Sequence, residues 1–155
     1  MKGPVFKAGG SMTDETIAIA GDHAGLELKN ALADQLRGLG YSVLDLGTNS
    51  ADSVDYPDFA DKMAEAFSGG SVHRGVLVCG TGIGISIAAN RHRHLRAALC
   101  HNSTDARLSR QHNDANVLVL GARTLGAEVA ADCLKTFLAT EFEGGRHQRR
   151  VSKMP

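Results

Sequence analysis

The chain has 155 residues, of which 43% are hydrophobic and 22% are charged. These values indicate a soluble globular protein of one domain with a substantial core. Lysine plus arginine and aspartate plus glutamate both total 17, so the formal net charge is zero. Any anion site must therefore be local, and neither nucleic acid nor a membrane is an expected partner. No apolar run approaches the roughly 20 residues that span a bilayer.

Residues 1–12 are interpreted as an expression-vector remnant or a disordered tail, because residues 9–11 read Gly-Gly-Ser like a linker. Residues 13–155 are then expected to form the single domain. The three cysteines are too few and too scattered for a disulfide scaffold. Their odd number fits a reducing cytoplasm, which is the expected location. No C-x-x-C spacing occurs, so a structural zinc site is not expected.

Strand and helix patterns alternate along the chain. Apolar runs predict five strands, at residues 17–20, 41–46, 75–78, 96–100 and 117–120. Helical spacing predicts five helices, at about 25–39, from Pro57 to about 67, and at 83–90, 103–111 and 126–142. A polar, basic tail follows. This order predicts an α/β fold, a three-layer αβα sandwich whose Rossmann-like five-stranded parallel sheet carries helices on both faces.

Polar residues follow every predicted strand. They are Gly21-Asp22-His23, Asp55-Tyr56, Cys79-Gly80-Thr81, His101-Asn102 and Gly121-Ala122-Arg123. Parallel sheets bind ligands outside the carboxyl ends of their strands. The functional site is therefore expected at this edge of the sheet.

The most informative stretch is 76–86, where an apolar strand ends in Cys79 and three glycines follow at alternate positions, Gly80, Gly82 and Gly84. Such glycines let backbone N–H groups converge on a small anion, although a tight turn that glycine makes sterically easier explains them equally well. The spacing is neither a Walker loop nor G-x-G-x-x-G, so no dinucleotide is indicated.

Cys79 has two interpretations. A cysteine at the end of a buried strand is commonly an inert core residue. Near a helix N-terminus, however, a thiol is more readily ionised, and a thiolate can act as a base or as a nucleophile. A nucleophile would also need an adjacent histidine and an orienting partner, which sequence does not show.

Two further groups allow both structural and functional readings. His112 could interact with a helix C-terminus or titrate near neutral pH, and Asn113 could hold a polyol hydroxyl. Arg123, Arg146 and Arg150 could clamp a phosphate, although terminal charge runs are usually solvated. Weak nucleic-acid contact by the tail is disfavoured by the zero net charge and the few aromatics.

Two histidine-containing segments have plain explanations. Asp22 could cap the first helix, since aspartate is common at helix starts. The run 91–94 reads Arg-His-Arg-His without a nearby acidic ligand, so it is interpreted as an exposed helix end and no metal site is expected.

Five ordered motifs recur together in one family. They are Gly21-Asp22-His23-Ala24-Gly25, Asp55-Tyr56-Pro57, the run from Cys79 to Asn90, Leu108-Ser109-Arg110-Gln111-His112-Asn113-Asp114, and Glu143-Gly144-Gly145-Arg146-His147. The chain closely resembles ribose-5-phosphate isomerase type B over about residues 17–151. That family also includes galactose-6-phosphate and allose-6-phosphate isomerases.

The resemblance implies an aldose–ketose isomerase that interconverts ribose 5-phosphate and ribulose 5-phosphate without a metal or organic cofactor. It assigns Cys79 as the base and Thr81 as the assisting hydroxyl. The N–H groups of residues 80–84 would hold the enediolate. His112 would open the furanose ring, with Asp22 supporting that step.

The resemblance also implies sugar contacts, a phosphate-binding set and a shared site. Tyr56 and Asn113 match the sugar contacts. The phosphate set matches His23, Arg123, Arg146 and Arg150. Family members are dimers or tetramers with the site at the subunit interface, where the neighbouring subunit supplies His112, Asn113 and the tail arginines.

Three questions stay open at this level. One branch of the family lacks the cysteine and carries a glutamate where Ile85 stands; Ile85 cannot accept a proton, which favours Cys79. His101-Asn102 varies in the family, so a six-carbon sugar phosphate is an alternative substrate. A phosphosugar-binding protein without turnover is the alternative from another class, and the presence of Cys79, Thr81 and His112 argues against it.

Overall fold

The computed structural model describes residues 13–155, and the tail predicted at 1–12 lies outside the described residues. Five parallel strands form one sheet in the order β2-β1-β3-β5-β4. The strands are β1 (Thr16–Gly21), β2 (Ser42–Asp45), β3 (Gly75–Cys79), β4 (Ala97–Leu99) and β5 (Val117–Gly121). All five predicted strands are therefore confirmed, with ends that differ by at most one residue.

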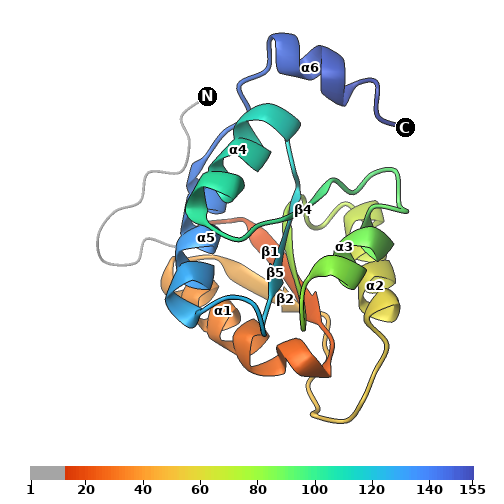
Figure 1. Ribbon diagram of the computed structural model, residues 1–155, viewed down its shortest axis with the longest axis vertical. Helices are drawn as coiled ribbons and strands as arrows, with labels where there is room; N and C mark the ends of the chain where they lie inside the picture. Colours follow the sequence, from red (N-terminus) through yellow and green to blue (C-terminus); the bar gives the residue numbers. More distant parts are fainter. Residues whose placement is uncertain (1–12) are drawn as a thin grey trace.

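Helices follow the strands and cover both faces of the sheet (Figure 1). They are the 3-10 turn η1 (His23–Gly25) and the α-helices α1 (Leu26–Gly38), α2 (Tyr56–Ser68), α3 (Ile83–Ala89), α4 (Ser103–Asn113), α5 (Ala127–Ala139) and α6 (Arg146–Val151). One core joins the sheet to α1, α4 and α5, and the other joins it to α2 and α3. The predicted three-layer sandwich is confirmed.

The division into two cores follows from alternation along the central strands. In β3, Val76 and Val78 point into the first core, whereas Leu77 and Cys79 point into the second. Every residue of β3 and β5 is buried, so both faces of these strands must be apolar. That requirement produces the continuous apolar runs by which parallel strands are recognised in a sequence. None of the described helices is long and apolar enough to cross a bilayer.

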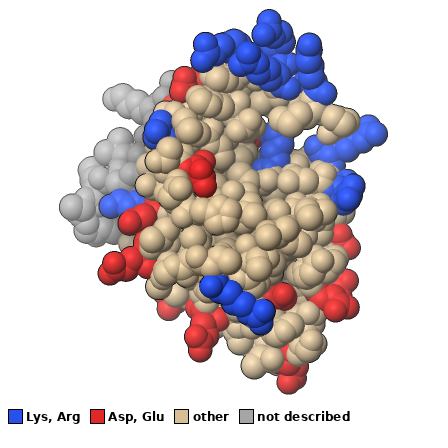
Figure 2. All heavy atoms as spheres, in the orientation of Figure 1, with Lys and Arg blue, Asp and Glu red and all other residues tan. Residues whose placement is uncertain are grey.

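The C-terminal region departs from the sequence-based expectation. The predicted helix 126–142 ends at Ala139, because Thr140 takes an extended conformation. The tail then forms a further helix, α6, after Gly144 and Gly145, which both have positive φ. Figure 1 shows α6 standing apart from the sandwich beyond α4, and Figure 2 shows Lys and Arg gathered over it. The basic tail therefore forms a helix that extends away from the sandwich.

Candidate active site

The strand order creates a switch point between β1 and β3. From β1 the chain continues to β2 on one side, and from β3 it continues toward β4 and β5 on the other. The helices that follow these strands cover opposite faces, α1 in one core and α3 in the other. Sheets of this kind bind ligands in the crevice outside such a point. Asp22 directly follows β1 and Cys79 ends β3, so both residues lie at this switch point.

Asp22 is held firmly at this edge. Its backbone N–H donates to the Val78 oxygen over 3.2 Å. Its Oδ1 accepts hydrogen bonds from the N–H groups of Ala24 at 3.0 Å and Gly25 at 3.2 Å. The capping interpretation of Asp22 is therefore confirmed. These bonds keep the carboxylate in a fixed orientation at the switch point.

The start of α3 directs two N–H groups at the two candidate proton-transfer groups. The Gly82 N–H donates to Cys79 Sγ over 3.2 Å, and the Ile83 N–H donates to Thr81 Oγ1 over 3.2 Å. These N–H groups lie at the first turn of α3, where no acceptor within the helix is available. Cys79 is only 4% exposed, whereas Thr81 is exposed. The two N–H groups therefore orient the thiol of Cys79 and the hydroxyl of Thr81.

Two of the loop glycines are required by close packing. Gly82 has φ +77°, and a Cβ added there would lie 2.5 Å from Leu99 Cδ1. A Cβ added at Gly84 would lie 2.6 Å from Cζ of Tyr56, so the tyrosine ring lies directly against that glycine. The glycine pattern therefore has a structural cause in addition to its open backbone, and it brings Tyr56 beside the loop.

Arg123 borders the same loop, and His23 directly follows Asp22 at the same edge of the sheet. The Arg123 N–H donates to the Gly80 oxygen over 2.7 Å, and a Cβ on Gly80 would lie 3.6 Å from the Arg123 Cζ. His23 Nδ1 accepts a hydrogen bond from the Val54 N–H over 3.1 Å, so in the neutral ring the proton resides on Nε2. His23 lines a surface groove of about 540 Å³, which Ala122 also lines. Both side chains can therefore donate to an anion at this edge.

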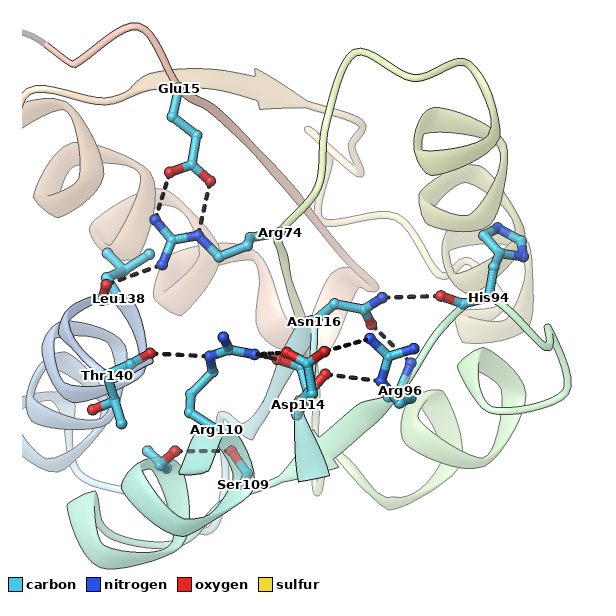
Figure 3. A network of polar contacts seen from close by, with 12 residues as sticks. Glu15, Arg74, His94, Arg96, Ser109, Arg110, Asp114, Asn116, Leu138 and Thr140 are labelled. Atoms are coloured by element: carbon cyan, nitrogen blue, oxygen red, sulfur yellow. Dashed lines mark hydrogen bonds and ion pairs between the residues drawn. The ribbon is translucent and has the colours of Figure 1, made fainter. Parts of the chain in front are cut away.

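His112 and Asn113 lie at the opposite edge of the sheet. They end α4, and the chain then enters β5 at Val117. The other end of β5, at Gly121, pairs with Cys79. Four residue steps along a strand span roughly 13 Å. Figure 3 shows the polar network beside this amino edge, where Asp114 accepts from Arg110 Nη1 over 2.9 Å. One chain therefore does not bring His112 and Asn113 to Cys79.

The arginines of α6 lie on the side of His112. The rings of His112 and His147 stack with 4.3 Å between centroids and 12° between planes. This contact joins α6, which carries Arg146 and Arg150, to the end of α4. The predicted site residues thus fall into two half-sites. The Cys79 half-site holds Asp22, His23, Tyr56, Cys79, Gly80, Thr81, Gly82, Gly84 and Arg123; the His112 half-site holds His112, Asn113, Arg146 and Arg150.

Residues 17–154 match the model of the family described as ribose/galactose isomerase. The chain belongs to this family. Ribose-5-phosphate isomerase B of Escherichia coli strain K12 is 47% identical over 135 residues, which cover 87% of this chain and 91% of that protein. The D-erythrulose-4-phosphate isomerase of Pectobacterium atrosepticum is 41% identical over 140 residues, or 90% of this chain and 92% of that protein.

Solved structures agree with this family membership. A ribose 5-phosphate isomerase from Thermotoga maritima has a TM-score of 0.89 and 51% identity, covering 92% of this chain and 98% of that one. Ribose-5-phosphate isomerase B from Clostridium thermocellum has a TM-score of 0.87 and 54% identity, covering 89% and 93%. The chain is therefore a sugar-phosphate isomerase with the α/β fold of these enzymes.

Two residues of the isomerase were missed by reasoning from sequence. Lys29 looks like an ordinary polar position on an amphipathic helix, but it is fully buried. His147 lies within a recognised motif, yet its stacking on His112 depends on the α4–α6 packing. The sequence feature that could have pointed to His147 was its position next to Arg146. No feature of the sequence pointed to Lys29.

Proposed function

We propose that this isomerase interconverts ribose 5-phosphate and ribulose 5-phosphate through an enediolate, with Cys79 as the base. The observation that carries the proposal is the pair of N–H groups bonded to Cys79 Sγ and Thr81 Oγ1. They orient a thiol and a hydroxyl side by side at the ligand-binding edge of the sheet. The reaction needs only proton transfers, which these two groups can perform without an organic cofactor or a metal.

The proton balance of this reaction closes within the site. The Cys79 thiolate takes the proton from C2 of the open-chain aldose, and the electrons of that C–H bond form the enediolate. The thiol returns the proton to C1, while the Thr81 hydroxyl moves a proton from O2 to O1. Backbone N–H groups of residues 80–84 stabilise the developing oxyanion, which is usually the largest catalytic contribution.

We further propose that a second copy of the chain completes each site. The separation of the two half-sites supports this arrangement. The exposed apolar side chains of Ile83 (54%) and Ile87 (52%) on α3 also support it, since they lie next to the Cys79 half-site. Burial of such side chains is the main driving force for association. Each substrate would then contact residues of both chains, in a dimer or a tetramer.

In the completed site, His112 of one copy opens the furanose ring while Asp22 of the other supports that step. Tyr56 and Asn113 contact sugar hydroxyls. The phosphate is held by cationic or donating side chains from both copies, namely His23 and Arg123 from one and Arg146 and Arg150 from the other. Binding energy from this remote group holds the reacting carbons against the thiolate.

We also propose that the enzyme is cytoplasmic, since its three free cysteines are consistent with a reducing compartment.

Mixing two inactive variants tests the shared site. Cys79→Ala and His112→Asn each remove one half-site function, but a mixed dimer has one site free of both substitutions. After random exchange of subunits, about a quarter of the wild-type activity is expected, since half of the dimers each regain one of two sites. Activity that stays at the sum of the two separate variants would refute the shared site.

Proton exchange tests the role of the thiol itself. Wild-type enzyme is expected to introduce solvent deuterium into ribose 5-phosphate, and Cys79→Ala is expected to lose exchange by about 10²–10⁴-fold while still binding the substrate. Cys133→Ala is the matched control, because Cys133 lies in the core between α5 and the sheet. Wild-type exchange in Cys79→Ala would remove the thiol as the base.

Sugar length is the remaining choice for the same chemistry. The relative named as a D-erythrulose-4-phosphate isomerase favours considering phosphosugars of other lengths. A comparison of kcat/KM for ribose 5-phosphate, allose 6-phosphate, galactose 6-phosphate and erythrulose 4-phosphate decides between them. A higher value for any substrate other than ribose 5-phosphate would replace the proposed substrate without changing the proposed mechanism.

A further inference from the structure

Lys29 is a fully buried cation outside both half-sites. Its Nζ donates to both carboxylate oxygens of Asp45, at 2.9 and 2.7 Å, and to Asn49 Oδ1 at 3.1 Å. It also contacts Asn30 Oδ1 at 3.2 Å. Burial of an ammonium is costly unless paired groups surround it, so this cluster holds its members in one arrangement.

Two of the partner residues lie at the end of β2, which is Asp45, and in the segment that follows it, which contains Asn49. Asp45 Oδ1 also accepts from the Gly47 N–H over 2.9 Å, which folds residues 45–49 around the ammonium. The same segment pairs with the end of β1. The Gly21 N–H donates to the Gly47 oxygen over 2.9 Å, and the Thr48 N–H donates to the Gly21 oxygen over 2.8 Å. Lys29 therefore fixes the chain that borders Asp22.

The far end of this segment contacts the proposed substrate-binding side chains. The Val54 N–H donates to His23 Nδ1 over 3.1 Å, and this bond sets which ring nitrogen carries the proton. Tyr56 comes two residues later and lies against Gly84. A displacement of residues 45–49 would thus reach His23 and Tyr56 through a short, continuous stretch of backbone.

We propose that Lys29 is a positioning residue that sets substrate affinity. Its ammonium holds residues 45–49 so that the Val54 N–H meets His23 Nδ1 and leaves the Nε2–H to donate to the substrate phosphate. The proposal rests on the proposed function for the assignment of His23 as a phosphate ligand. Lys29 itself touches no substrate and acts only through the segment from Asp45 to Tyr56.

Lys29→Met tests this role, because methionine keeps the length of the side chain and removes the charge. Loss of one well-aligned hydrogen bond to the phosphate is expected to raise KM about 10- to 100-fold. The kcat is expected to stay within roughly threefold, since Cys79 and Thr81 are untouched. Lys135→Met, at an exposed position on α5, is the matched control and should leave both constants unchanged.

The single variant leaves the Asp45 carboxylate without its cation, so destabilisation alone could raise KM. The double variant Lys29→Met with Asp45→Asn removes both charges and is expected to recover much of the lost melting temperature. KM should remain raised in this double variant, because a methionine at position 29 donates no hydrogen bond to residue 45 or to Asn49. A KM that returns to the wild-type value together with the melting temperature would overturn the positioning role.

Imidazole nitrogen NMR gives a readout independent of turnover. In wild-type protein, His23 is expected as the Nε2–H tautomer with Nδ1 accepting, assigned by loss of its signals in His23→Asn. In the double variant, a mixture of tautomers is expected. An unchanged His23 signature would overturn the proposal, even if wild-type enzyme is found to act on another phosphosugar. Absence of ribose 5-phosphate turnover in wild type would instead refute only the proposed function.

Discussion

Replacement of Gly82 by alanine tests the geometry of the thiol loop. Gly82 has φ +77°, a conformation that costs a residue with a Cβ about 1–2 kcal/mol. The added methyl group would also lie 2.5 Å from Leu99 Cδ1 and 3.2 Å from the carbonyl carbon of Leu120. Overpacking of this kind costs about 1–3 kcal/mol, because buried neighbours must shift. Together, the two effects predict a loss of about 2–5 kcal/mol in unfolding free energy.

Two other glycines separate these contributions. Gly144 has φ +67° with no atom within 4 Å of an added Cβ, so Gly144→Ala should show the backbone cost alone, about 1–2 kcal/mol. Gly38 ends α1 with a helical backbone and equally open space. Gly38→Ala should therefore stabilise the protein by about 0.5–1 kcal/mol. From most to least stable, the predicted order is Gly38→Ala, wild type, Gly144→Ala and Gly82→Ala.

Urea unfolding followed by circular dichroism, with all variants at one protein concentration, measures these differences. Gly82→Ala should also lower kcat, because its N–H would move from Cys79 Sγ. A Gly82→Ala variant that loses no more stability than Gly144→Ala would refute the packing argument. Normal kcat in a folded Gly82→Ala protein would show that the N–H bond to sulfur is not required.

Thiol chemistry and pH give two further expected outcomes. Burial raises the pKa of Cys100 to about 12 and that of Cys133 to about 11, so both remain neutral at pH 8. Iodoacetamide should therefore label Cys79 first by peptide mass analysis, and faster labelling of either core cysteine would contradict this. Partial burial and the adjacent His112 lower the pKa of His147 below 6.5. The unfolded chain then binds more protons, so melting temperature should fall as pH drops below about 6.5, and less steeply in His147→Phe. Equal slopes of melting temperature against pH in wild type and His147→Phe would contradict the lowered pKa of His147.

Much of the fold is visible in local sequence. The runs at β3 and β5 are apolar at every position because both faces are buried, and a continuous run of that kind leaves little choice of structure. The end of α5 was harder to predict, because the apolar pattern continues to Phe142 while the helix stops at Ala139. The helix α6 lacks an apolar stripe, and its position depends on contact with α4 instead.

The Cys79 half-site was also largely predictable, because parallel strands deliver their carboxyl-end residues to one edge. Cys79 ends β3, and Asp22 and Arg123 come within two residues of the ends of β1 and β5, so all three lie at that edge. The partners of their backbone could not be predicted, since the Val54 N–H reaches His23 from a residue 31 positions away. Buried Lys29 likewise depends on Asp45 across the β2 turn.

Sequence alone determined the α/β architecture, because strand and helix periodicity follows from residues that are adjacent in the chain. The side chains proposed to carry the chemistry were predicted from the motifs shared with the family. Only the tertiary structure decided that His112 and Cys79 lie at opposite edges of one sheet. The physical reason is that α4 runs back along the sheet before β5 begins, so its last residues lie a full strand length from the thiol.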